Sequence, residues 1–393
     1  MILIALFSEV LFNVILVIAI LLSSFYGILM WNYVSAWRSL SSFSAPSDGQ
    51  PSTKIDVIIP ARNEGANIAA CLQSIFKNSY SSDLFQVYVV DDFSRDQTAD
   101  IVEDIMEEYS NLHLIRMHHF PEEEKNAFKK AAIKKGIESG RGELIVCTDA
   151  DCIVPQNWLW EIATYYEQTQ VQFIAAPVLF HQEKGKLGQF QSLDFAGMML
   201  ITGAGIHQSW MHMSNGANLA YTRNAFQKVN GFQGIDQLAS GDDMLLMQKI
   251  AQAFPGQLGF LKSNNAVVQT LPQSSYRDFV RQRIRWASKS SHYPEWKVTA
   301  ALAGVFFFCW AIVLSFLLIP FAPGFFSLLL LSLFTFKSVI DYLLLREACL
   351  FFHRKELLQS FITSQLHHIL YICWVGLMAN FQKRYVWKGR KVR

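Results

Sequence analysis

The stretch Ile145-Val146-Cys147-Thr148-Asp149-Ala150-Asp151 decides the fold of this chain. Its apolar first half predicts a buried strand, and the two carboxylates follow where that strand ends. Residues i and i+2 of a strand project to the same side, so Asp149 and Asp151 are expected to converge. Two converging carboxylates suit Mg²⁺ or Mn²⁺, which can hold substrate phosphates in their remaining positions. An Asp-x-Asp after a strand is also common turn chemistry, so the motif needs support from the rest of the chain.

The composition indicates a folded domain joined to membrane segments. The chain has 393 residues, enough for a domain of about 250 residues and a further part. Hydrophobic residues make up 51% and the mean hydropathy is +0.20, which is high for a soluble enzyme. The net charge is only +2, and no nucleic-acid partner is expected. The six cysteines show no paired close spacing, which predicts reduced thiols in a protein that faces the cytoplasm.

Strand and helix patterns alternate from Ile55 onward. Short apolar runs predict strands at 55–60, 85–90, 112–117 and 144–148, and the runs between them predict helices at 66–76, 98–109 and 129–139. This alternation is typical of a parallel sheet covered on both faces, in which ligands bind beyond the carboxyl ends of the strands. Asp91 and Asp92 end the second predicted strand, so both acidic pairs are expected at one edge of the sheet.

A series of motifs between residues 55 and 286 resembles the family 2 glycosyltransferases with a GT-A fold. In order they are Pro60-Ala61-Arg62-Asn63-Glu64, Asp91-Asp92-Phe93-Ser94-Arg95-Asp96-Gln97-Thr98, Lys129-Lys130-Ala131, Thr148-Asp149-Ala150-Asp151, Asn215-Gly216-Ala217-Asn218, Gly241-Asp242-Asp243 and Gln282-Arg283-Ile284-Arg285-Trp286. Each motif alone is a weak signal, and their order and spacing make the resemblance strong. The chain departs from the family pattern at Phe93 and Phe128, where glycine is usual, and at Asp242, where glutamate is common.

The resemblance implies a role for each motif. Asp149 and Asp151 would hold the metal. Asn215, Gly216 and Trp286 would meet the acceptor. Asp243, with Asp242 beside it, would be catalytic and take the proton of the attacking hydroxyl, which implies an inverting transferase. The residues expected to bind the nucleotide-sugar donor, a UDP-sugar, are Pro60, Arg62, Asn63, Glu64, Asp91, Asp92, Lys129, Asp149, Gln282, Arg285 and Trp286.

Several of these residues also have a structural interpretation. Asp242 and Asp243 suit the N-terminus of a helix predicted from Met244, and the two roles can hold at once. Residues 276–286 carry four arginines, and Arg281 and Arg285, one turn apart, can face the site while Arg277 and Arg283 point elsewhere. A basic helix on anionic lipid headgroups is the alternative. The apolar segment 190–206 is expected in the core, with a lipid-facing position as the alternative.

Hydrophobic segments at both ends predict membrane helices. Residues 10–30 carry no charge, and Arg38 and Lys54 follow them, so the positive-inside rule puts the next domain in the cytoplasm. Residues 298–319 and 325–345 are predicted to form a hairpin, in which Lys337 and Asp341 pair. Residues 357–380 are predicted to be re-entrant or interfacial, because a crossing would put the basic tail outside. His367 and His368 are expected on a polar face of that segment.

These expectations combine into an α/β protein, a GT-A cytoplasmic domain with a mostly parallel sheet and transmembrane helices at both ends. The expected function is inverting transfer of a sugar from a nucleotide-diphospho-sugar to a lipid at the cytoplasmic face of the inner or plasma membrane. A processive polysaccharide synthase with a glycan acceptor is the alternative, and an inactive scaffold subunit is a further one. The oligomeric state stays open. The expected segments are a transmembrane helix at 1–37, a linker at 38–54, the GT-A domain at 55–275, an interfacial helix at 276–297, a membrane region at 298–380 and a basic tail at 381–393.

Overall fold

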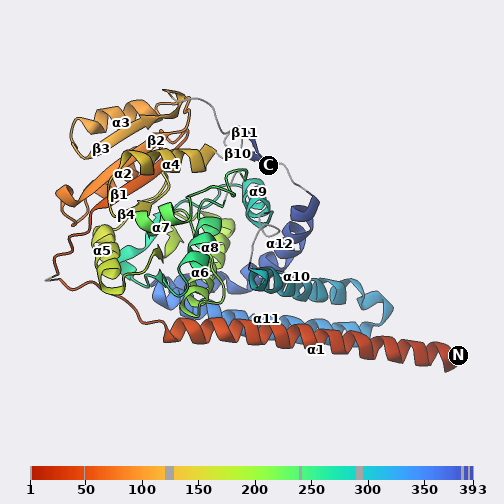
Figure 1. Cartoon of the computed structure of the whole chain (residues 1–393). Coiled ribbons are helices and arrows are strands. Elements are labelled where there is room, and N and C mark those ends of the chain that lie inside the picture. Colours follow the sequence, from red (N-terminus) through yellow and green to blue (C-terminus); the bar gives the residue numbers. More distant parts are fainter. Residues whose placement is uncertain are drawn as a thin grey trace. The chain divides into compact units, whose positions relative to one another are not determined.

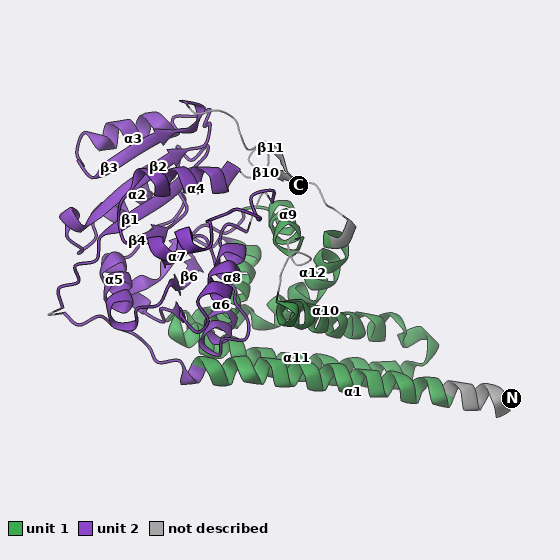
Figure 2. Ribbon diagram, in the orientation of Figure 1, with its two compact units in different colours: residues 1–37, 185–200, 274–382 green, residues 38–184, 201–273, 383–393 purple. Residues whose placement is uncertain are grey.

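The computed structural model describes residues 2–47, 49–119, 128–238, 241–288, 295–381, 385–387 and 390–392. They form two compact units, which Figure 2 colours separately. The helical unit comprises residues 1–37, 185–200 and 274–382, and the sheet unit comprises residues 38–184, 201–273 and 383–393. Residues 185–200 therefore group with the helices, although they lie inside the boundaries predicted for the GT-A domain.

A seven-stranded sheet forms the centre of the sheet unit (Figure 1). Its strand order is β3-β2-β1-β4-β7-β5-β8. The neighbours β3, β2, β1 and β4 are parallel, whereas β7 runs antiparallel to both β4 and β5. The expected mostly parallel sheet is confirmed. The strands are β1 (Ile55–Ala61), β2 (Phe85–Asp91), β3 (Leu112–Arg116), β4 (Leu144–Cys147), β5 (Phe173–Ala175), β7 (Leu219–Thr222) and β8 (Leu258–Phe260).

Helices cover the sheet, and β1, β2 and β4 are buried along almost their whole length, as expected for strands covered on both faces. These helices are α2 (Ile68–Phe76), α3 (Thr98–Met106), α4 (Phe128–Ser139), α5 (Trp158–Thr169), α7 (Arg223–Lys228) and α8 (Met244–Ala253). Two short strand pairs complete the unit, β6 (Val178–Phe180) with β9 (Val268–Thr270), and β10 (Tyr385–Trp387) with β11 (Arg390–Val392). The rest of the predicted basic tail lies outside the described residues.

The strand directions bring four loops to one edge of the sheet. Because β1, β2 and β4 are parallel, their carboxyl ends lie at the same edge, where Ala61 pairs in register with Asp91. Antiparallel β7 begins at that edge, with Leu219 opposite Cys147 at the end of β4. The expectation that both acidic pairs share one edge is confirmed. The Asn215–Asn218 motif joins them because it directly precedes β7.

The helical unit consists of long apolar helices together with the amphipathic α9. Within the part of the chain that the structure describes, four segments are long and apolar enough to cross a membrane, at residues 9–39, 296–317, 323–351 and 355–379. The hairpin break is confirmed, because a short turn at Ile319–Phe321 separates α10 from α11 and Pro323 begins α11. α12 is one continuous helix, and its depth in a membrane stays a prediction. The helices are α1 (Ile2–Ser39), α6 (Gly185–His207), α9 (Tyr276–Ala287), α10 (Trp296–Leu317), α11 (Pro323–Phe351) and α12 (Phe361–Phe381). Of α6, only the part up to Leu200 belongs to this unit.

A buried polar cluster joins α1, α11 and α12. The predicted ion pair of Lys337 with Asp341 is confirmed. The ammonium of Lys337 also lies 3.2 Å from the hydroxyl of Tyr26 and 3.4 Å from Nδ1 of His368. Gln365 donates through Nε2 to Oδ2 of Asp341 at 2.7 Å, the same oxygen that Lys337 contacts. This cluster satisfies the two charges inside otherwise apolar helices, where unpaired charges would be costly.

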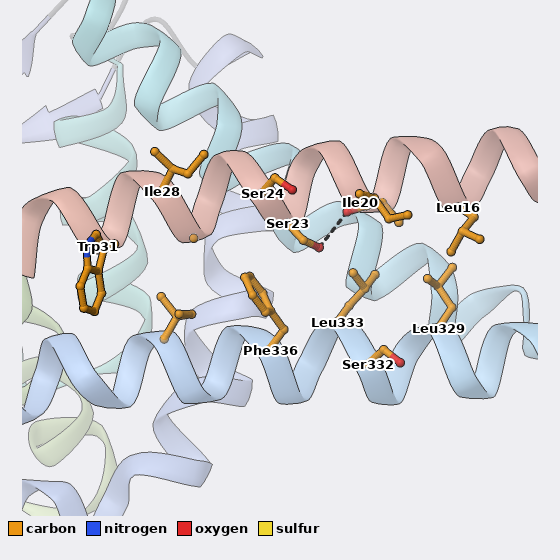
Figure 3. A pocket seen from close by; sticks show the side chains of 13 residues that line it. Leu16, Ile20, Ser23, Ser24, Ile28, Trp31, Leu329, Ser332, Leu333 and Phe336 are labelled. Atoms are coloured by element: carbon orange, nitrogen blue, oxygen red, sulfur yellow. Dashed lines mark hydrogen bonds between the residues drawn. The ribbon is translucent and has the colours of Figure 1, made fainter.

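An apolar groove of about 740 Å³ lies between α1 and α11 (Figure 3). Leu16, Ile20 and Ile28 line it from α1, and Leu333 and Phe336 line it from α11. Its hydroxyl groups are few, and that of Ser23 donates to the Ala19 carbonyl of its own helix. The groove therefore offers almost only hydrocarbon contact.

The segment 190–206 on α6 lies in the core. Every residue in it is buried or half-buried, so the core interpretation is confirmed and the lipid-facing alternative is wrong. Phe190 packs against Phe279 of α9 and Tyr371 of α12 in one apolar cluster. These contacts explain why residues 185–200 group with the helices.

Candidate functional site

The loops that follow β1 and β2 lock together through hydrogen bonds. The guanidinium of Arg62 is buried and donates to the carbonyl oxygens of Asp92, at 2.5 Å, and Phe93, at 2.9 Å. Asn63 receives a bond from the Arg95 backbone, and its own N–H donates to Ser94. Arg62, predicted to bind the nucleotide-sugar, therefore braces the neighbouring loop, and its contact with the donor stays a prediction.

Two residues in these loops adopt the left-handed backbone conformation. Asn63 has φ of 52° and Phe93 has φ of 56°. Asparagine tolerates this region, but a bulky residue there is strained. Glycine is usual in the family at the position of Phe93, and the positive φ is the physical reason for that preference.

The two aspartates at the end of β2 are almost completely buried. Asp91 is 1% exposed and Asp92 is 3% exposed. An oxygen of Asp91 accepts from the Ser94 N–H at 3.3 Å, and the Asp92 N–H donates to Ala61 at the end of β1. The pair thus anchors the loop, and its predicted role toward base and ribose stays a prediction.

The metal motif sits in a turn rather than on a strand. β4 ends at Cys147, and the Cys152 N–H bonds the carbonyl of Asp149 to close a four-residue turn. The expectation that strand alternation aligns Asp149 with Asp151 is therefore wrong, because the strand stops before either residue. The hydroxyl of Thr148 donates to the carbonyl of Ala217 at 2.8 Å, which ties this turn to the loop before β7.

Lys129 connects the metal motif with the Gly-Asp-Asp motif. Its ammonium lies 2.8 Å from Oδ1 of Asp149 and 3.1 Å from Oδ2 of Asp242. Burial alone would lower the pKa of Lys129, but the charges of Asp149 and Asp242 outweigh it and hold this pKa well above its usual value. The lysine therefore stays cationic at neutral pH. It was predicted to bind the nucleotide-sugar, and that role stays a prediction.

Asp243 begins α8 and also holds the loop before β7. Its Oδ1 accepts from the Met244 N–H at 2.7 Å, which confirms the helix N-terminal role. Its Oδ2 accepts from the Gly216 N–H at 3.2 Å. Gly241, with φ of 86°, supplies the turn that presents both aspartates. The carboxylate is thus oriented from two sides, as a general base requires.

Gly216 is packed within this cluster. A Cβ there would lie 3.3 Å from Nζ of Lys129 and 3.4 Å from Oδ2 of Asp242. Asn215 beside it uses its side-chain oxygen to accept from the Ala217 N–H at 2.9 Å. Four of the predicted motifs, those of Lys129, Asp149, Gly216 and Asp243, therefore meet at one place.

The residues fit a divalent cation of the hard class. Asp149 is a one-third exposed carboxylate, and Asp151 lies in the same turn. Among the described residues, no group of three or more His, Cys, Asp or Glu side chains could hold a metal. Two carboxylates with phosphate oxygens and water in the other positions are the usual ligand set of Mg²⁺ beside a nucleotide. Asp149 and Asp151 would therefore suit a cation that binds together with the donor.

The remaining predicted residues lie on α9, in the helical unit. Among the described residues, nothing hydrogen-bonds the buried side-chain oxygen of Gln282. The Arg281 side chain is 60% exposed and lies 3.7 Å from Asp278. Arg283 points inward, with 4% exposure, and pairs with Asp194 at 2.8 Å. The expected grouping put Arg281 and Arg285 toward the site and Arg277 and Arg283 elsewhere. Arg283 does lie on a different face from Arg281, but Arg277 is exposed like Arg281, and the roles of Arg281 and Arg285 stay predictions.

The comparisons with known proteins identify the family. The model of Glycosyl transferase family 2 matches residues 56–229, and that of Glycosyl transferase family group 2 matches residues 144–381. This chain belongs to the family 2 glycosyltransferases. The family match covers the motifs of Asp91, Asp149, Asp243 and Trp286, whose roles in this family 2 chain stay predictions.

Curated relatives of this family 2 chain are similar over part of their length. Glycosyltransferase AglE of Haloferax volcanii is 27% identical over 190 residues, which are 48% of this chain and 59% of AglE. Beta-monoglucosyldiacylglycerol synthase of Trichormus variabilis is 25% identical over 117 residues, which are 30% of this chain and 24% of that protein. The matches thus span little more than half of AglE and a quarter of the synthase.

A solved structure shows the same fold. Mannosyltransferase PcManGT from Pyrobaculum calidifontis, solved in complex with GDP-Man and Mn²⁺, superposes with a TM-score of 0.57 at 19% identity. The likeness covers 92% of this chain and 99% of that one. At this identity it shows the fold alone, and the GT-A fold expected from the sequence is confirmed.

The sequence did not reveal two of the side chains that organise the site. Asp96 accepts from the Gly65 N–H at 2.9 Å and from Thr98, so it holds the loops after β1 and β2 together. Its place in the Asp-Asp-x-Ser-x-Asp-x-Thr segment was the available signal. Asp194 carried no signal, because an aspartate inside an apolar helix gives no indication of its partner.

Proposed function

We propose that this protein transfers a sugar from a nucleotide-diphospho-sugar, a UDP-sugar, to a membrane lipid, with inversion at the anomeric carbon. One observation carries the proposal. The ion pairs of Lys129 with Asp149 and Asp242, and the bond from Gly216 to Asp243, bring these side chains and the loop of Gly216 into one cluster. This closeness supports the roles proposed for them as metal ligand, acceptor loop and base. Transfer needs these three parts side by side, because the attacking hydroxyl must reach the sugar while the diphosphate leaves.

The donor would bind at the carboxyl edge of β1, β2 and β4. Asp91, Asp92 and the loop from Pro60 to Glu64 would hold base and ribose, and Asp149 and Asp151 would hold Mg²⁺ or Mn²⁺. When bound, the cation supplies positive charge that stabilises the departing diphosphate. Lys129 adds a fixed positive charge beside Asp149.

Asp243 would act as the general base. It would accept the proton of the acceptor hydroxyl as the oxygen bonds to the anomeric carbon and the bond to the diphosphate breaks. The N–H groups of Met244 and Gly216 orient its two oxygens, while the carboxylate keeps lone pairs for that proton. Attack opposite the leaving group inverts the anomeric configuration, so a single base is sufficient.

A lipid acceptor is supported by the surfaces of the long helices. Large apolar side chains stay exposed along α1 and α11, among them Leu21 at 64%, Ile28 at 62% and Leu328 at 66%. Such surfaces need hydrocarbon around them. One relative is named as a diacylglycerol glucosylating synthase, which supports the same acceptor class.

The proposed location is the cytoplasmic face of a membrane. Arg38 lies in the last turn of α1, where the chain continues into the residues of the sheet unit, and the positive-inside rule places that end in the cytoplasm. A cysteine introduced at Ser42 should react with a membrane-impermeant maleimide in inside-out vesicles and not in right-side-out vesicles. The reverse pattern would place the sheet unit outside.

Product analysis tests the function. The protein in lipid nanodiscs is incubated with labelled UDP-sugars and Mn²⁺, and the products are divided between organic solvent and water. A single-sugar product in the organic phase is expected. A polymer retained in water would support the polysaccharide synthase instead, and the absence of any product with every sugar and lipid tried would contradict transfer.

A variant pair tests the base. Asp243→Asn should keep nucleotide binding and lower transfer by about 10²–10⁴-fold, because the amide oxygen can still cap α8 whereas the amide cannot take the acceptor proton. The matched control is Asp83→Asn. Asp83 is exposed and lies in the short helix before β2, at the opposite end of that strand from Asp91, so this variant should transfer at the wild-type rate. Equal loss of binding and turnover in Asp243→Asn would overturn its assignment.

A further inference from the structure

An ion pair is buried where α9 packs against α6 and α12. The Nη2 atom of Arg283 lies 2.8 Å from Oδ2 of Asp194, and these side chains are 4% and 7% exposed. The hydroxyl of Tyr371 donates to the other oxygen, Oδ1, at 3.1 Å. The same hydroxyl lies 3.4 Å from Oδ2, so both oxygens of Asp194 are engaged, by α9 at Oδ2 and by α12 chiefly at Oδ1. The three residues come from three helices of the helical unit.

Aromatic rings enclose the guanidinium. Its carbon lies 4.5 Å from the ring centre of Trp286 and 5.1 Å from that of Phe279. A planar guanidinium over an indole face is a favourable cation–π arrangement. Trp286 is the last residue of the Gln-x-x-Arg-Trp motif, so Arg283 directly contacts a residue assigned to the acceptor side.

The surroundings of Arg283 would suit an apolar residue. The inner face of α9 consists of Phe279, Arg283 and Ile284, and Phe279 and Ile284 belong to a cluster with Phe190 and Tyr371. Taking a charge pair out of water costs several kcal/mol, and well-packed apolar residues in its place are often as stable or more stable. An ion pair here is therefore better explained by the geometry that it imposes.

That geometry controls the face of α9 that carries the motif. Gln282 and Arg285 are three residues apart and share one face, and Trp286 is four residues from Gln282. A rotation of α9 about its axis would move all three together, and the ion pair of Arg283 opposes such a rotation. The buried side-chain oxygen of Gln282 has no hydrogen-bond partner among the described residues. Such an oxygen can accept a hydrogen bond from a bound ligand.

We infer that Asp194 and Tyr371 are positioning residues of the transfer site, which hold Arg283 and through it the orientation of Trp286 and Gln282. The inference rests on the proposed function, because it assigns the motif to transfer. α12 can act as a fixed support, since its Gln365 and His368 bind the Lys337–Asp341 pair one to two turns before Tyr371.

Kinetics with a charge-free variant separate positioning from folding. In Arg283→Met with Asp194→Leu, no buried charge is left unpaired, so the unfolding midpoint in nanodiscs should stay near that of the wild type. Transfer should nevertheless fall by roughly 10–100-fold, with nucleotide affinity unchanged. A double variant that folds and transfers at the wild-type rate would overturn the inference.

Two further variants sharpen the result. Arg283→Lys keeps the positive charge but loses the planar stacking on Trp286, so its transfer rate should be as low as that of the charge-free variant. Transfer at the wild-type rate would mean that the charge alone positions the helix. Tyr371→Phe removes the hydroxyl that donates to Asp194 and keeps the ring, so it should lower kcat several-fold in a protein that still folds. An unchanged kcat would exclude Tyr371 from the positioning role.

A chemical readout is independent of transfer. In Gln282→Cys, the reaction of the cysteine with a maleimide reports how far this face of α9 is exposed, and the native cysteines, all buried, give the background. Combining this variant with Arg283→Met and Asp194→Leu should change the labelling rate several-fold, because the ion pair that opposes rotation of α9 is then removed. An unchanged rate would contradict positioning even if transfer occurs, whereas a changed rate, with no transfer by the protein that retains Gln282, would contradict only the proposed function.

Discussion

Lys129 forms an ion pair with Asp149, with 2.8 Å between Nζ and Oδ1, at the edge of the sheet where the acidic motifs gather. The same ammonium reaches Asp242 at 3.1 Å, so one cation joins the turn after β4 to the start of α8. The two carboxylates would otherwise repel each other across the site. Lys129 thus stabilises the arrangement on which the proposed chemistry depends.

Lys129→Gln should lower the free energy of unfolding by about 1–3 kcal/mol, because the ion pairs with the partly exposed Asp149 and the buried Asp242 are lost. Mn²⁺ should restore part of this loss, since it can supply positive charge beside Asp149. Thermal unfolding with and without Mn²⁺ measures both effects. Lys134→Gln, exposed on the same helix, is the control. If Mn²⁺ stabilised the wild type and Lys129→Gln equally, the cation and the Lys129 ammonium would not both lie beside Asp149.

Asp151→Ala should abolish the metal dependence of nucleotide binding. Titration of UDP with and without Mn²⁺ is expected to show tighter binding with metal in the wild type and no difference in the variant. The exposed Asp83→Ala should behave as the wild type. If Mn²⁺ strengthens binding to Asp151→Ala as well, Asp151 is not a ligand.

Phe93→Gly should be more stable than Phe93→Ala by about 1 kcal/mol, because only glycine adopts the positive φ of this position without strain. Both variants remove the ring, so the comparison isolates the backbone. Chemical denaturation measures the difference. Alanine equal to or better than glycine would mean that the left-handed conformation is absent in solution.

Asp96 should make stability depend on pH at the acidic end. Partial burial raises its pKa, but hydrogen bonds from Thr98 and Gly65 outweigh this and leave the pKa below its usual value. A lowered pKa gives stability that is present above the unfolded-state value and is lost as pH falls through the folded-state value, here below about pH 4. The wild type should therefore exceed Asp96→Asn in unfolding midpoint at pH 7, and the gap should shrink below pH 4. A constant gap would contradict this linkage.

Lys337→Met alone should destabilise the helical unit by roughly 3–5 kcal/mol, because it leaves Asp341 charged and buried. Lys337→Met combined with Asp341→Leu should recover most of that loss. Retention of folded protein in detergent on heating compares the three proteins. A double variant no more stable than the single one would mean that the cluster with Tyr26 and His368 depends on the charges themselves.

Local patterns were sufficient for the elements and for their order. The strand predicted up to Thr148 and the hairpin at Pro320–Gly324 were correct within a residue or a few, because periodicity and turn chemistry are properties of neighbouring residues. The position of Asp149 and Asp151 in a turn agrees with the turn chemistry that the sequence offered as the alternative, whereas the alternation argument failed because it assumed that the strand continued. The strand ends at Cys147, and the hydrogen bond from the Cys152 N–H to the Asp149 carbonyl closes the turn that follows.

The sequence by itself determined the family, the sheet edge that carries the acidic motifs and the apolar helices at both ends. Each follows from motif order or from residue spacing along the chain. Only the tertiary structure decided that Lys129 joins Asp149 to Asp242, that Arg62 braces the loop of Phe93 and that Arg283 is held by Asp194. Such partners are far apart in sequence, and a buried charge finds its counterpart through packing, which no local pattern records.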